Sequence, residues 1–236
     1  MSFSQDTLLV FDRPGIAESP YIVGRKSVQL EVGTAYTEKT GISSSLLPTF
    51  LLRKFIGLQT ELRLTMNYEP QMLGIILSNN RLDLDPLALG LKHKLFKETN
   101  WLPEAGVIVN VFYPLQYFRS RIDPINWEVN FVFQNTIRDD FSINYNLGYL
   151  VSSQFQKGVF SSSLCLTHNF SEKFGVFVEA FNYTPLREFN EYGYDLGCTY
   201  NLGRVSQIDF SIINNKYCER DYFSVMIGYA YKFIYK

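Results

Sequence analysis

The chain has 236 residues, with 22 basic and 23 acidic side chains and a net charge of −1 at pH 7. Because this balance gives no field that attracts a polyanion, it argues against the simplest kind of nucleic-acid-binding protein. With 2 His, 3 Cys and no closely spaced ligand pairs, neither a multi-ligand zinc site nor a disulfide framework is expected. The apolar runs cover only a few residues each, whereas a transmembrane helix needs roughly 20.

Hydrophobic residues make up 46% of the chain and aromatic residues 16%, which is rich for a soluble domain. A transmembrane β-barrel reaches this composition without long apolar runs, because its lipid-facing residues alternate with lumen-facing ones. Such alternation is the dominant pattern of the sequence from residue 27 onward. Composition and pattern together predict an all-β fold.

The segment before the first alternation is predicted to be periplasmic (residues 1–24), and a barrel is predicted over residues 25–236. Small residues stand at positions 2 and 4, as at the −3 and −1 positions of a signal-peptidase site, so residues 1–4 are interpreted as a leader remnant. Two prolines and a glycine within residues 11–20 favour a defined irregular path. The candidate residues of this segment are Asp12, Arg13, Pro14, Gly15 and Glu18.

Ten extended residues reach about 33 Å, farther than a twelve-stranded lumen is wide, so the segment is expected to pack into or across the lower opening of the barrel. Arg13 is then expected to meet a lumen carboxylate such as Glu31 or Glu104. An ordered hook on the outside of the turns is the open alternative.

Twelve segments alternate between apolar and polar side chains. In the first of them Val28, Leu30 and Val32 share one face, and Gln29 lies on the other. The segments are 27–37, 46–55, 60–68, 87–95, 104–113, 127–134, 141–149, 158–168, 174–183, 192–200, 206–213 and 222–235. Short connections alternate with long ones, which is typical of outer-membrane barrels and places both chain ends on the periplasmic side. The predicted fold is an antiparallel transmembrane (outer-membrane) β-barrel of about 12 strands.

Alternation by itself does not distinguish a soluble β-sandwich from a membrane barrel whose apolar face points outward. The polar face is rich in Gly, Ala, Ser and Asn, which suits a crowded lumen better than a solvated surface. Aromatic residues gather at strand ends, as in the girdles of membrane barrels. Tyr36, Trp127 and Tyr149 are predicted towards the long loops, and Phe55 and Phe133 towards the short turns. These features favour the membrane barrel.

The segment Phe11-Asp12-Arg13-Pro14-Gly15-x-x-Glu18-Ser19-Pro20 resembles the start of the outer-membrane "transporter" barrels of the Bacteroidetes type, the meta-pathway phenol-degradation family. Less specific matches occur at residues 51–53, 62–64, 88–92 and 177–179, so the likeness covers nearly the whole chain. The resemblance implies an outer-membrane barrel with a role in small-solute passage. It implies no catalytic residues.

The sequence contains no local nucleophile–base pair of the kind that indicates an enzyme. His168 has Leu166 and Phe170 at two-residue spacing, and His93 likewise has apolar neighbours on its strand face. Both histidines are therefore interpreted as interfacial or lipid-facing. We predict a protein that is not an enzyme and that has no cofactor and no metal site.

The polar face of the predicted strands supplies the candidate lumen residues. The basic wall consists of Arg53, Arg63, Lys92, Lys94 and Lys232. The acidic wall consists of Glu31, Glu61, Glu104, Glu128, Glu179, Asp195 and Asp209. Most of the bases fall on the second to fourth strands and most of the acids on the fifth to eleventh, so two opposed walls would orient dipolar solutes. The alternative is a salt-bridge network that fills the interior and closes it.

The predicted function is passive passage of small solutes, apolar or aromatic ones among them, through a barrel in the bacterial outer membrane. The alternative is a structural or accessory barrel with a closed lumen, within a larger outer-membrane complex. The expected partners are outer-membrane lipid and lipopolysaccharide, a small solute and other outer-membrane proteins; nucleic acid is not expected.

Overall fold

The computed structural model describes residues 10–13, 15–39, 43–66, 87–113, 126–151, 158–185, 190–217 and 220–235. Every regular element among these residues is a β-strand, and they include no helix long and apolar enough to cross a membrane. The strands are β1 (Ser27–Lys39), β2 (Ser43–Gly57), β3 (Thr60–Met66), β4 (Leu87–Phe96), β5 (Glu104–Tyr113), β6 (Asn126–Arg138), β7 (Phe141–Val151), β8 (Val159–Asn169), β9 (Phe174–Pro185), β10 (Glu191–Asn201), β11 (Ser206–Tyr217) and β12 (Arg220–Ile234).

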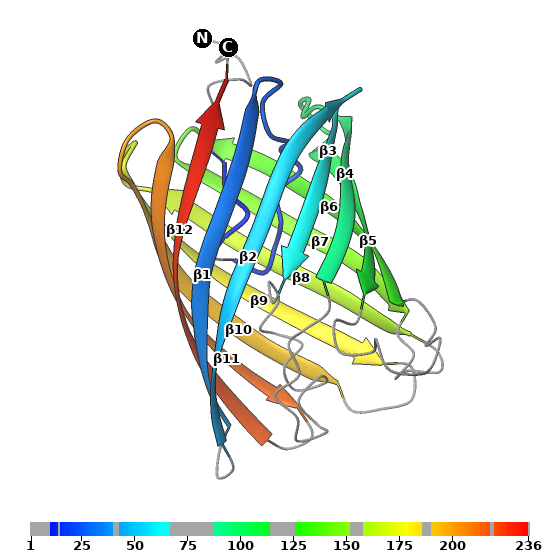
Figure 1. The fold of residues 1–236 in the computed structure, drawn as a ribbon, viewed down its shortest axis with the longest axis vertical. Helices are drawn as coiled ribbons and strands as arrows, with labels where there is room; N and C mark the ends of the chain where they lie inside the picture. Colours follow the sequence, from blue (N-terminus) through cyan, green and yellow to red (C-terminus); the bar gives the residue numbers. More distant parts are fainter. Residues whose placement is uncertain are drawn as a thin grey trace.

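The twelve strands form one closed barrel in which each strand pairs antiparallel with its sequence neighbours and β12 pairs with β1 (Figure 1). The seam between β1 and β12 runs without interruption from the pair Ser27–Ile234 to the pair Lys39–Tyr222. Closure satisfies the backbone hydrogen-bonding groups that an open sheet edge would leave unpaired. The predicted antiparallel β-barrel of about 12 strands is confirmed.

The two ends of the barrel differ. β1 begins and β12 ends at the same end, at the top of Figure 1, which we call the turn end. The connections at the turn end are short and comprise residues 58–59, 97–103, 139–140, 170–173 and 202–205. We call the opposite end, where β1 ends and β2 begins, the loop end.

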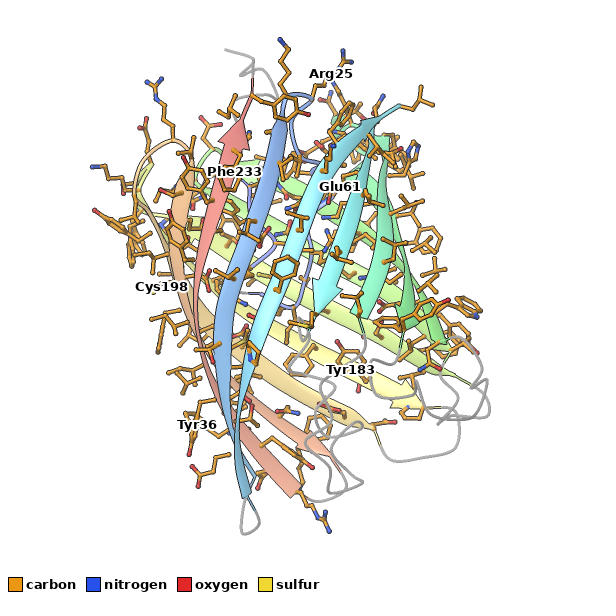
Figure 2. The ribbon with its side chains drawn as sticks, viewed as in Figure 1. Arg25, Tyr36, Glu61, Tyr183, Cys198 and Phe233 are labelled. Atoms are coloured by element: carbon orange, nitrogen blue, oxygen red, sulfur yellow. The ribbon has the colours of Figure 1, made fainter. Side chains whose placement is uncertain are left out.

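The barrel is apolar outside and polar inside, the reverse of a soluble protein. In β4 the side chains of Lys92 and Lys94 are buried, whereas those of Leu91 and Leu95 on either side of this pair are exposed. Tyr36 on β1 likewise points away from the barrel (Figure 2). Because alternate residues of each strand face opposite sides, the same pattern that exposes the apolar residues directs the charged ones into the lumen.

Aromatic rings on the outer face contact one another near both ends. Near the loop end the ring centroids of Trp127 and Tyr149 are 6.4 Å apart, and those of Tyr149 and Phe160 are 4.8 Å apart. Near the turn end Phe133 stacks on Tyr145 with a centroid separation of 5.2 Å. These contacts form parts of the two aromatic girdles that the sequence predicts.

Residues 10–24 run inside the barrel before β1 begins (dark blue in Figure 1). We call this segment the plug; Pro14 within it lies outside the described residues. Near one end the Val10 carbonyl accepts a hydrogen bond from Gln29 Nε2 at 2.8 Å, and near the other the Val23 N–H donates to Glu61 at 2.8 Å. Both ends of the plug are therefore held in the turn half, and the chain between them folds back inside the lumen.

Candidate functional site in the lumen

A cluster of charges is centred on Asp12 of the plug. Its Oδ2 atom lies 2.6 Å from Arg63 Nη1, 2.8 Å from Lys92 Nζ and 3.2 Å from Arg53 Nη1. The three cations project from the adjacent strands β2, β3 and β4, where the alternation points them inward. Burial by itself disfavours the ionised carboxyl, but the three cations outweigh it and hold the pKa of Asp12 well below its usual range.

The same cations bind three further carboxylates, one of which is Glu31, 3.4 Å from Arg53 Nη1. Glu18 of the plug lies 2.7 Å from Arg63 Nη2 and 3.6 Å from Lys92 Nζ. Glu61 on β3 accepts hydrogen bonds from Arg53 Nε at 2.8 Å and from Arg63 Nη1 at 3.2 Å. Removing one partner of a buried ion pair leaves an uncompensated charge, so each of these pairs resists separation. The network therefore holds the side chains of Asp12 and Glu18 tightly to the wall formed by β2, β3 and β4.

Three wall carboxylates hold the plug through its backbone. The hydrogen bonds run from Asp12 N (3.3 Å) and Arg13 N (2.9 Å) to Glu31, from Ile16 N (2.8 Å) and Ala17 N (2.5 Å) to Glu179, and from Val23 N (2.8 Å) to Glu61. An irregular segment has no ladder to satisfy its own N–H groups, and a buried N–H without a partner costs about 1–3 kcal/mol. The wall carboxylates therefore make the irregular path of the plug possible.

The Arg13 side chain lies in a slot formed by two glycines. Gly33 on β1 and Gly228 on β12 face each other across the seam, and a Cβ atom at either position would collide with the Arg13 guanidinium. The guanidinium forms an ion pair with Asp209 at 3.2 Å and donates a hydrogen bond to Thr49 Oγ1. Glycine is required here because the guanidinium approaches the barrel wall closely.

The Arg13 side chain meets a lumen carboxylate, as expected, but not one of the two that the sequence analysis names as examples. Its partner is Asp209, while Glu31 binds the Arg13 backbone N–H and Glu104 pairs with Lys94. The glycine slot explains why Asp209 is the partner. The missing side chains of Gly33 and Gly228 leave space for the guanidinium beside β12, next to Asp209 on β11. Periodicity predicts that Asp209 faces the lumen but not that this space exists.

The remaining candidate wall residues lie apart from this cluster. Glu128 accepts a hydrogen bond from Asn110 Nδ2 at 3.1 Å. Asp195 is buried on β10 and faces Glu179 across the pair of strands β9 and β10, and Lys232 is buried on β12. The bases of β2 to β4 thus meet carboxylates of the plug and of nearby strands, rather than facing an acidic wall across open space.

A cavity of about 930 Å³ lies between the plug and strands β6 to β11. Its wall side chains include Gln134, Asn144, Cys165, Thr167, Phe177 and Thr199, and its plug side includes Phe11, Asp12, Arg13 and Tyr21. The exposed turn residues Asp139 and Glu172 border it, so it opens at the turn end. These wall residues could not be singled out from the sequence, because uncharged polar residues at lumen-facing positions occur along most of the strands.

The loop half of the lumen contains a buried apolar cluster beside buried polar side chains, among them Thr37, Glu191, Asn215 and Ser224. The cluster consists of Ala35, Leu150, Val159, Phe181, Tyr183, Ile213, Tyr222 and Met226. Ile16 of the plug packs against it, and Figure 2 shows Tyr183 on the far side of the barrel. The ion pairs of Asp12 therefore lie nearer the turn end of the lumen, and this apolar cluster lies nearer the loop end.

Both histidines lie near the turn end. His93 Nδ1 is 2.8 Å from Thr60 Oγ1, and His168 Nδ1 is 3.6 Å from Asp140. The His168 ring also contacts Phe170 edge-on, with 4.5 Å between ring centroids. Each histidine therefore has a local structural partner at the end of a strand.

Solved structures of the same fold are outer-membrane channels and porins. An outer membrane channel from Pseudomonas putida F1 has a TM-score of 0.67 at 10% identity, over 93% of this chain and 99% of that chain. The KdgM porin in complex with disordered oligogalacturonate has a TM-score of 0.58 at 8% identity, over 86% and 99%. The CymD monoaromatic hydrocarbon channel has a TM-score of 0.54 at 9% identity, over 89% of each chain. At these identities the likeness shows a shared fold.

No curated protein matches the chain in sequence. The family described as "Putative MetA-pathway of phenol degradation" matches residues 11–229, which is nearly the whole chain and includes the N-terminal motif. The chain therefore belongs to this family.

Proposed function

We propose that the protein allows small solutes, apolar or aromatic ones among them, to pass passively across the outer membrane of a bacterium. The apolar outer face with aromatic rings near both ends supports a position in lipid. The observation that carries the proposal is the cavity of about 930 Å³, which opens at the turn end beside a plug bound by ion pairs and hydrogen bonds. Passage is a non-enzymatic function.

Two of the similar structures support passage without fixing one solute. One is described as a monoaromatic hydrocarbon channel and the other as a porin in complex with an oligogalacturonate. The apolar cluster in the loop half of the lumen favours apolar or aromatic solutes for this chain. The Bacteroidetes origin stays a prediction, as do lipopolysaccharide and other outer-membrane proteins as partners.

The second candidate function is a structural barrel whose lumen stays closed. The observation that favours it is the buried network around Asp12, which joins the plug to three strands and fills part of the lumen. A network of this kind stabilises a barrel whether or not solutes pass.

Liposome swelling separates the two functions. Liposomes containing the full chain are diluted into isotonic solutions of small neutral solutes that cross a bare bilayer slowly, such as arabinose or glucose, and solute entry is followed by light scattering. If solutes pass through the protein, liposomes that contain it should swell faster than protein-free liposomes. The rate of swelling should fall as the solute becomes larger. Equal rates with and without protein would instead favour the closed barrel.

A further inference from the structure

Two connections at the turn end carry apolar side chains that are almost fully exposed. Leu58, in the turn between β2 and β3, is 92% exposed, and Trp101, in the connection between β4 and β5, is 94% exposed. The girdle rings of Phe133 and Tyr145 lie within strands, whereas these two side chains lie in the connections between strands. The apolar surface of the barrel therefore extends into its turns.

The backbone of the turn that carries Leu58 is strained. Gly57 pairs with Thr60, so Leu58 and Gln59 form a two-residue hairpin loop, and their φ angles are 48° and 57°. Loops of this kind favour Asn, Asp and Gly, because most other residues adopt a positive φ only at a cost in free energy. In water a leucine here is unfavourable twice, through its backbone conformation and through its exposed side chain. In lipid the exposure of the side chain becomes favourable.

Hydrogen bonds hold both connections in place beside each other. Lys94 N donates to Gln59 O at 3.0 Å, which joins the end of β4 to the β2–β3 turn. In the connection between β4 and β5, Glu98 Oε1 accepts a hydrogen bond from Thr136 N of β6 at 2.7 Å. The two exposed apolar side chains are therefore presented by neighbouring turns that are attached to the rim of the barrel, at the top of Figure 1.

The exposed turn residues continue the apolar outer face of the strands. Ile56 on β2 and Leu95 on β4 are exposed, and each lies between its turn and an exposed polar residue of the same strand. These polar residues are Lys54 and His93. Neither prevents contact with lipid beyond it, because a lysine can extend its charged end along the barrel towards the headgroups, and His93 Nδ1 lies 2.8 Å from Thr60 Oγ1. The apolar surface is therefore continuous from the lipid-facing strands to the turns.

The turn patch is defined by the residues Ile56, Leu58, Leu95, Trp101 and Leu102. We infer that this patch inserts into the lipid leaflet at the turn end of the barrel. The inference rests on the proposed position of the barrel in the membrane and adds a lipid contact made by the turns to those made by the strands. Tryptophan suits this place, because its ring is apolar and its N–H group can bond to the headgroup region. Insertion holds in the membrane the turn ends of β2, β3 and β4, the strands whose cations bind Asp12.

The two tryptophans of the chain allow a direct test, because Trp101 lies in the turn patch and Trp127 in the girdle near the loop end. The full chain with Trp127→Phe, and separately with Trp101→Phe, is reconstituted into phosphatidylcholine vesicles with and without bromine on the acyl chains close to the headgroup. Bromine quenches tryptophan fluorescence only at close range. The emission of Trp101 should therefore fall about twofold or more in brominated lipid, as should that of Trp127.

Each other result decides against the inference in a distinguishable way. Quenching of Trp127 without quenching of Trp101 would overturn it and leave the barrel in the membrane, with the turn patch facing water or a protein partner. Quenching of neither tryptophan, with both variants folded by circular dichroism, would remove the proposed membrane position and the inference with it. Liposome swelling of the same vesicles measures passage separately from either result.

The substitution Leu58→Asn tests the part played by the strained turn. Asparagine adopts a positive φ readily, so the variant should fold at least as stably as the unaltered chain. In the Trp127→Phe background it should reduce the quenching of Trp101 by about half, because the neighbouring turn loses its apolar side chain. Leu202→Asn is the matched control, because Leu202 is 52% exposed in the connection between β10 and β11, outside the turn patch. Equal quenching of Trp101 in the Leu58 variant and in the control would contradict insertion of the β2–β3 turn.

Discussion

Arg13 of the plug and Asp209 of β11 form an ion pair with an N–O distance of 3.2 Å, and both side chains are almost fully buried. The preceding residue, Asp12, binds cations of β2, β3 and β4. Two consecutive residues thus attach the plug to strands on both sides of β1. The plug is therefore fixed to the lumen wall on both sides of β1.

The substitution Asp12→Asn should strongly destabilise the plug. It leaves three buried cations with less compensating charge, and breaking a buried ion pair in this way costs about 3–5 kcal/mol. Urea unfolding in detergent micelles measures the loss. Asp140→Asn is the control, because Asp140 pairs with Arg138 on an exposed turn, where ion pairs contribute about 0–1 kcal/mol. Similar losses for the two variants would contradict the network.

The contribution of Asp12 should depend on pH in a defined range. Its pKa is lowered in the folded protein, so its stabilising effect is fully present above the unfolded value of about 3.9 and declines as pH falls further. The difference in unfolding free energy between the unaltered chain and Asp12→Asn should stay constant from about pH 8 to pH 5. It should shrink below about pH 4. A difference that already shrinks between pH 7 and pH 5 would show that the cations do not hold the carboxylate ionised.

The glycine slot should be intolerant of a side chain only while Arg13 occupies it. A Cβ at position 228 would lie 2.5 Å from Arg13 Nε, so Gly228→Ala should cost about 1–3 kcal/mol. In an Arg13→Ala background the same substitution should cost much less, as a double-mutant cycle measures. Gly203→Ala, where a Cβ meets nothing within 4 Å, should be near neutral in both backgrounds. Equal costs of Gly228→Ala with and without Arg13 would contradict the slot.

The orientation of the barrel is tested by cysteine labelling in intact cells. In a background without the native cysteines, Asn190→Cys between β9 and β10 at the loop end should react with a membrane-impermeant maleimide. Gly203→Cys in the turn between β10 and β11 should not react until the cells are opened. The opposite pattern would place the turn end outside the cell.

Much of the barrel follows from the sequence, because alternation determines both the strands and the side that each residue faces. Phe55 is an exception: the sequence predicts it on the outer girdle, but it alternates in phase with the inward-facing Arg53 and pairs with the inward-facing Glu61. The prediction for Phe55 is wrong, and a register shift between Phe55 and Gly57 follows directly after it.

The lumen itself was less predictable. The charged residues around Asp12 could be named because charges at inward-facing positions stand out. The partner of Arg13 could not be predicted, because it depends on the close approach of two glycines on strands far apart in sequence. Asn144 and Phe177 could not be recognised as cavity residues, because the cavity exists only where the plug leaves β6 to β11 uncovered.

Single-channel recording in planar bilayers tests the central claim, which is that the barrel forms a passage narrowed by the plug. The full chain and a variant lacking residues 5–20 are compared under the same salt and voltage. We predict a small steady conductance for the full chain and a clearly larger one for the variant, because the deletion removes most of the plug residues that border the cavity. No conductance from either protein, with both folded and inserted, would contradict it.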